Sequence, residues 1–164
     1  MKTFDRGLDG LSELPTPSIM TIRRLSVQLM YQLEHQVITA LGDEAFATFC
    51  EQNDVDAALQ QWLRRSADLA LQARDEQDRW IKAASTNWNL SRIGRVELAV
   101  LRVCLSELAH RSNVKVATIM ADAAEIAKEF GTDRSPAFVH GILDSIYRQQ
   151  MATATTEQEP HSLD

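Results

Sequence analysis

Residues 93–108 read Ile93-Gly94-Arg95-Val96-Glu97-Leu98-Ala99-Val100-Leu101-Arg102-Val103-Cys104-Leu105-Ser106-Glu107-Leu108 and form the most apolar run of the chain. The apolar residues repeat at helical spacing and cover more than one face of a helix. A helix that is apolar on several sides must be covered by neighbours on those sides. The run therefore predicts a central, buried helix over 92–111, with the other segments packed around it.

The segments on both sides of this run also show helical spacing, which predicts helices over 18–40, 43–51, 54–84, 115–130 and 135–150. Thr16-Pro17 and Ser135-Pro136 are helix-start signals, and Gly131 is expected to cap a helix end. No Pro or Gly interrupts residues 43–93, so 54–84 is either one long helix or two helices with a subtle bend. The pattern as a whole predicts an all-α fold, a compact bundle of six to seven helices.

The ends of the chain differ from the middle in composition. Residues 1–15 contain two glycines, a proline and little periodicity, and residues 152–164 are polar and acidic. We expect a disordered leader at 1–15, a single helical domain at 16–151 and a disordered acidic tail at 152–164.

The charge balance limits the classes of partner. The net charge is −6 and the isoelectric point is about 5.2, which argues against a protein that coats nucleic acid through charge alone. A local basic site remains compatible with these values. No signal peptide and no apolar run of transmembrane length is present, so a cytoplasmic location without membrane contact is expected.

The sequence contains no pattern that points to catalysis. Its six glycines form no phosphate-binding loop, its histidines lack metal-ligand spacing, and no nucleophile motif is present. The two cysteines, Cys50 and Cys104, are far apart, and a buried free thiol is the simplest interpretation of Cys104. We therefore expect a binding protein with no catalytic residue, no metal and no cofactor.

One face of the first predicted helix carries residues suited to RNA. Arg24, Gln28 and Tyr31 share this face and Arg23 lies near it. Arginine can hold phosphate or stack on a base, glutamine can read a base edge, and the tyrosine ring can pack against a partner. The alternative is a solvated helix end with Tyr31 half-buried in the core.

Several motifs in this order and spacing resemble the NusB family of transcription antitermination factors. They are Val27-Gln28 with Tyr31, Trp88-Asn89-Leu90-Ser91-Arg92-Ile93, Val96-Glu97, Leu101-Arg102, Glu107-Leu108, Glu125-Ile126-Ala127-Lys128-Glu129-Phe130-Gly131 and Phe138-Val139 with Gly141. The resemblance covers residues 18–150 and is most specific in the C-terminal half.

The resemblance implies a function in binding. Such a protein binds the boxA element of nascent ribosomal RNA together with NusE, a small-subunit ribosomal protein, and joins the RNA polymerase elongation complex to prevent early termination. It implies RNA contacts by Arg23, Arg24 and Gln28, with Arg92, Arg95 and Lys128 as secondary contacts, and places Tyr31 at or near the partner surface. Some family members self-associate, so a homodimer stays open.

The chain also departs from the family pattern. Residues 18–22 lack the extra basic residues of the family, Leu98 replaces a basic residue, and Ala121, Asp122 and His140 replace Asn, Glu and Asn. These losses support an alternative, a divergent protein–protein interaction module that has lost RNA recognition. Two further expectations concern packing: Glu107 is structural although Arg102 is poorly spaced to pair with it, and Gly141 allows close approach of another helix.

Overall fold

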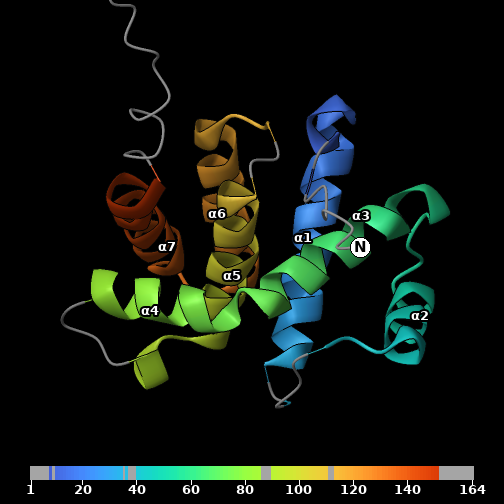
Figure 1. Cartoon of the computed structure of the whole chain (residues 1–164), viewed down its shortest axis with the longest axis horizontal. Helices are drawn as coiled ribbons and strands as arrows, with labels where there is room; N and C mark the ends of the chain where they lie inside the picture. The colour runs from blue at the N-terminus through green and yellow to red at the C-terminus, as the bar shows by residue number, and fades with distance from the viewer. Residues whose placement is uncertain are drawn as a thin grey trace, which may run out of the picture.

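The structure is a computed structural model that describes residues 8, 10–34, 36, 40–85, 90–110 and 113–151. In this part of the chain every regular element is helical, which confirms the all-α prediction. The α-helices are α1 (Thr16–Leu33), α2 (Asp43–Gln52), α3 (Ala57–Gln72), α4 (Arg74–Ala84), α5 (Arg95–Ala109), α6 (Val116–Phe130) and α7 (Ser135–Ile146) (Figure 1). Short 3-10 turns lie at Leu11–Glu13 (η1) and Leu90–Arg92 (η2), and a π turn at Tyr147–Met151 (η3) follows α7.

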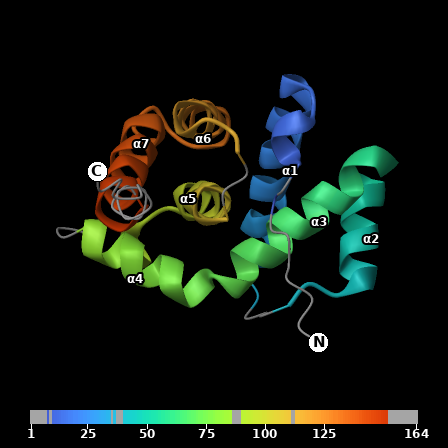
Figure 2. The ribbon, with the colours of Figure 1, turned by 45° about the horizontal axis from the view of Figure 1, so that its top comes forward.

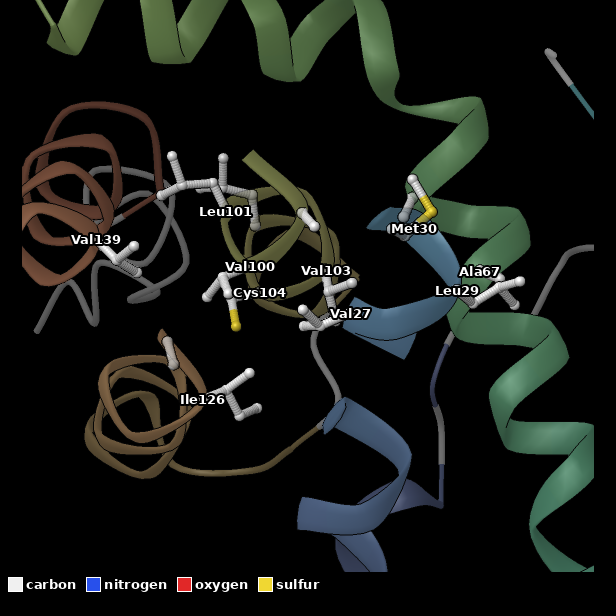
Figure 3. Packing of buried hydrophobic residues seen from close by; sticks show 14 of the residues in the cluster. Val27, Leu29, Met30, Ala67, Val100, Leu101, Val103, Cys104, Ile126 and Val139 are labelled. Atoms are coloured by element: carbon white, nitrogen blue, oxygen red, sulfur yellow. The ribbon is translucent and has the colours of Figure 1, made fainter. Parts of the chain in front are cut away.

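The apolar run at residues 93–108 lies at the centre of the bundle. Seen nearly end-on in Figure 2, α5 lies among α1, α4, α6 and α7. All ten residues from Ala99 to Leu108 are buried, as the pattern predicted. In Figure 3, Val103 points toward Val27 of α1, and Val100 and Cys104 lie on the side facing Ile126 of α6. Burial raises the pKa of the Cys104 thiol to about 12.

The long segment 54–84 consists of two helices that meet at Ala73. Polar contacts from α5 hold this junction. The buried Arg102 donates from Nε to Glu34 Oε1 (2.6 Å), and its Nη1 lies 2.7 Å from Asp78 Oδ1. Gln77 Nε2 in turn donates to the carbonyl of Arg102 (2.9 Å). The break therefore depends on partners distant in sequence, which explains why no Pro or Gly marks it.

The N-terminal segment is better packed than the expected disordered leader. Leu8 and Leu11 are buried and form a second apolar cluster with Ile22 of α1 and Leu69 of α3. Gly10, at a φ of 86°, passes close to the ring of Trp62, a backbone conformation that favours glycine. Residues 8 and 10–15 thus belong to the folded domain, whereas residues 1–7 and 152–164, with Trp88 and Asn89, lie outside the described residues.

Helix ends differ from the sequence signals in detail. Helix α1 has Pro15 at its N-cap, so Thr16 is the first helical residue and not the cap, and the helix ends at Leu33, well before residue 40. Likewise Ser135 is the first residue of α7, preceded by Arg134 at the N-cap. The Ser135 hydroxyl instead accepts from the Thr132 amide (2.9 Å) and donates to the Glu97 carboxylate, which ties the start of α7 to α5.

One of the two predictions for glycines is confirmed. Gly131 is the C-cap of α6, and its amide donates to the Ala127 carbonyl oxygen (2.9 Å), although its φ of −104° is not the left-handed conformation typical of a glycine cap. A Cβ at this position would come within 2.7 Å of the Ala127 carbonyl oxygen and would also meet Ser135, so the lack of space requires glycine. The prediction for Gly141 is wrong: it is exposed, and no atom lies within 4 Å of its Cβ position. Finally, none of the helices described is long and apolar enough to cross a membrane.

Candidate nucleic-acid interface on α1, α5 and α6

The two adjacent arginines of α1 have opposite environments. Arg23 is 1% exposed, and its guanidinium donates from Nε to Glu107 Oε2 (2.6 Å) and from Nη2 to Glu107 Oε1, while Nη1 contacts Asp122. It thereby links α1 to α5 and α6. The expectation that Arg23 contacts RNA needs correction, because its donors face carboxylates inside the protein. This is the same stripe of α1 that buries Val27 and Met30.

Glu107 has the partner that the sequence left unassigned. Its carboxylate is 3% exposed, and the partner is Arg23, 84 residues away in the sequence. Burial alone would lower the pKa of Arg23, but the hydrogen bond and the charge of Glu107 raise it above its usual value. Arg23 therefore keeps its charge, and the burial of Glu107 against it confirms the structural interpretation of Glu107.

Arg24 lies on the surface, on the neighbouring face of α1. Its Nε donates to Glu129 Oε2 of α6 at 2.9 Å, and the two side chains are 36% and 43% exposed. An exposed pair of this kind is weak and is screened by salt. The guanidinium of Arg24 therefore remains within reach of a ligand, in contrast to that of Arg23.

A groove of about 400 Å³ begins one turn further along α1. Its lining combines aromatic, aliphatic and amide side chains: Val27, Gln28, Tyr31, Gln32, Asn53, Val96 and Phe130. Tyr31 is 40% exposed, the largest exposure of a bulky apolar side chain in the described part of the molecule. The groove thus brings the predicted Gln28 and Tyr31 together. The sequence prediction missed Gln32, which lies one turn after Gln28 on α1, and Asn53, which only the fold brings to this face from the end of α2.

The three secondary basic residues are exposed, and two of them lie on helices that line the groove. Arg95 begins α5, directly before the groove residue Val96, whereas Arg92 belongs to η2, which contributes no residue to the groove. Lys128 lies on α6, two residues before Phe130. Within the described residues, no cluster of His, Cys, Asp and Glu could hold a metal ion. The surface offers cations, amides and an aromatic ring, which are groups suited to binding.

Comparisons with known proteins agree with this architecture. The model of the NusB family matches residues 20–148. A transcription antitermination protein NusB of Myxococcus xanthus is 33% identical over 128 residues, which cover 77% of this chain and 91% of the relative. The NusB of Geobacter sulfurreducens is 46% identical over a shorter stretch of 76 residues, which spans 46% of this chain and 55% of the relative.

Solved structures show the same fold. NusB of T. maritima superposes with a TM-score of 0.71 at 26% identity, covering 88% of this chain and 99% of that one. A crystal structure of antitermination factors NusB and NusE in complex with dsRNA contains a chain that superposes with a TM-score of 0.72 at 19% identity, covering 82% and 98%. With the family model matched over most of its length and the buried α5 at the centre of the same fold, this chain belongs to the NusB family, whose curated relatives are transcription antitermination proteins.

Proposed function

We propose that this protein is a transcription antitermination factor that binds boxA RNA of nascent ribosomal RNA transcripts together with NusE. In this proposal the complex joins the elongating RNA polymerase in the cytoplasm and acts by binding, not by catalysis. The observation that carries it is the exposed face of α1, where Arg24 precedes a groove lined by Gln28 and Tyr31, in a chain of the NusB family.

The RNA contacts that we propose come from the cations and amides around this groove. Arg24, Arg95 and Lys128 would hold phosphates, with Arg92 beside them, and Gln28 would read a base edge. Arg23 is left out because it is buried against Glu107. Each phosphate contact on a single strand contributes about 0.7 to the slope of log K against log salt. With so few cations around this groove, binding of RNA by the protein alone is expected to be weak.

Tyr31 and the apolar part of the groove are the proposed contact with NusE. A half-exposed tyrosine beside Val27 and Phe130 offers a flat apolar surface with a hydroxyl at its edge. Such rings are frequent energetic centres of protein interfaces. Partner and RNA would then bind on adjacent parts of the same face, so that each extends the surface available to the other.

A second candidate function is a protein–protein module without RNA recognition. It is favoured by the burial of Arg23, by the pairing of Arg24 with Glu129 and by the net charge of −6. Under this alternative the Tyr31 groove still binds NusE, but no RNA follows.

A titration of fluorescent boxA RNA with and without NusE from the same organism, at two salt concentrations, separates the two functions. Binding that requires NusE and falls on Arg24→Ala supports the antitermination factor. NusE binding that is lost on Tyr31→Ala, with no RNA bound in any mixture, supports the protein-only module. Absence of both NusE and RNA binding contradicts both proposals.

A further inference from the structure

The ion pair between Arg24 and Glu129 has a consequence for ligand affinity. The Glu129 carboxylate accepts from Arg24 Nε at 2.9 Å, a position that a phosphate oxygen would otherwise take. Both side chains remain more than a third exposed, so the pair is at the surface of the proposed RNA site and not in the core.

We propose that Glu129 is an internal competitor of the RNA phosphate, which lowers the affinity of this chain for RNA by occupying and neutralising Arg24. This inference rests on the proposed function, since it concerns the same site. Glu129 is a determinant of affinity that acts through Arg24, and the ligand that it opposes is the phosphate backbone of single-stranded RNA.

Two physical effects act in the same direction. First, the Glu129 carboxylate accepts the hydrogen bond from Arg24 Nε. A phosphate can bind the guanidinium through two N–H groups on that edge only after this ion pair has opened. Second, the negative charge of Glu129 offsets the positive charge of Arg24, so the pair as a whole attracts a phosphate less. Fewer counterions are then released from the RNA when the protein binds. Because the pair is exposed, it can open, and the protein therefore loses affinity without losing the site.

The neighbouring arginine shows why the competition is specific to Arg24. Arg23 also faces carboxylates, but it and Glu107 are both buried, so no phosphate can exchange with them. On α6 the exposed Glu125 lies one turn before Glu129 and carries the same charge. Glu125→Gln is therefore a matched control, which removes one negative charge from the same helix.

The test compares E129Q, E125Q and the double variant R24A/E129Q in RNA titrations with NusE present. At low salt, E129Q is expected to bind RNA about two- to fivefold more tightly than the unmodified protein, the range that exposed ion pairs allow. The slope of log K against log salt should steepen by up to about 0.7. E125Q should change affinity less, because its effect acts only through screened charge.

The outcomes separate this inference from the proposed function. An E129Q gain that disappears in the R24A background supports the competition. A gain equal to that of E125Q, or one that persists without Arg24, overturns it, as does no gain. If Arg24→Ala lowers RNA affinity while E129Q has no effect, the inference alone fails. If E129Q and the unmodified protein both fail to bind RNA with NusE bound, the competition and the RNA-binding function fail together.

Discussion

Replacing Arg23 by alanine is expected to damage the fold far more than a surface arginine could. The guanidinium is 1% exposed, and two of its three hydrogen bonds go to the Glu107 carboxylate, which is itself 3% exposed, while the third goes to Asp122. Removal of one partner from a buried ion pair leaves an uncompensated charge and costs about 3–5 kcal/mol. Because a domain of this size has a free energy of unfolding of about 5–15 kcal/mol, this single change would remove a large part of its stability.

Urea unfolding followed by circular dichroism measures this loss. The natural control is Arg24→Ala, a change at the next residue to the same side chain, which should lower the free energy of unfolding by at most about 1 kcal/mol because its pair with Glu129 is exposed. The double variant R23M/E107Q removes the two buried charges and should recover much of the loss, since the carboxylate that then lacks Arg23, Asp122, is 18% exposed and can be hydrated.

A loss below about 1 kcal/mol for Arg23→Ala, similar to that for Arg24→Ala, would refute this reasoning. In that case Arg23 would not be the internal link between α1, α5 and α6. A large loss in R23M/E107Q as well would show that packing of the side-chain stem, and not the charge pair, carries the stability.

The remaining predictions concern packing and the two thiols. Gly141→Ala should raise the free energy of unfolding by up to about 1 kcal/mol, because the site is exposed and open and alanine favours the helix; differential scanning calorimetry should show a rise in Tm. Gly131→Ala should lower Tm in the same assay, because its Cβ would meet the backbone and Ser135. Leu11→Ala should lower the free energy of unfolding by about 2–5 kcal/mol or detach the segment 8–15 from α1 and α3. Limited proteolysis should then cut within 8–15 sooner than in the unmodified protein. Iodoacetamide at pH 8 should label neither Cys50 nor Cys104 in the folded protein but both in urea, as read by mass spectrometry, because burial raises both thiol pKa values and shields both sulfurs.

The core and the order of helices could be predicted because they depend on local periodicity. The apolar run of α5 predicts its own burial, because a helix that is apolar on several faces must be covered by neighbours whatever those neighbours are. The junction at Ala73 could not be predicted, because its determinants are Arg102 of α5, Asp78 of α4 and Glu34, which follows α1. The packing of Leu11 against α3 could not be predicted for a similar reason. Leu8 and Leu11 are two apolar residues among glycines, and two residues are too few to show a helical repeat.

The candidate site was predicted in part. Its α1 face could be found, since Arg24, Gln28 and Tyr31 recur at helical spacing. The opposite side of the groove, with Asn53 and Phe130, comes from the ends of α2 and α6, whose positions depend on how the bundle closes. The carboxylate of Glu129 was likewise invisible as a partner, because no spacing rule links residues 105 positions apart.

The division between the two arginines could nevertheless be inferred from charge and periodicity taken together. Arg23 lies four and seven residues before Val27 and Met30, so it belongs to the buried stripe of α1. A buried cation requires a buried anion, and of the two carboxylates in the apolar run of α5, Glu97 and Glu107, Glu107 is the one among its buried residues. A lone Arg23 or a lone Glu107 would be improbable in a core, whereas the two together form an ion pair that compensates both charges. The cations of the proposed RNA site should therefore be counted only after the residues of the buried stripe have been set aside. This leaves Arg24 as the exposed arginine of α1, and in our proposal the RNA affinity then depends on its competition with Glu129.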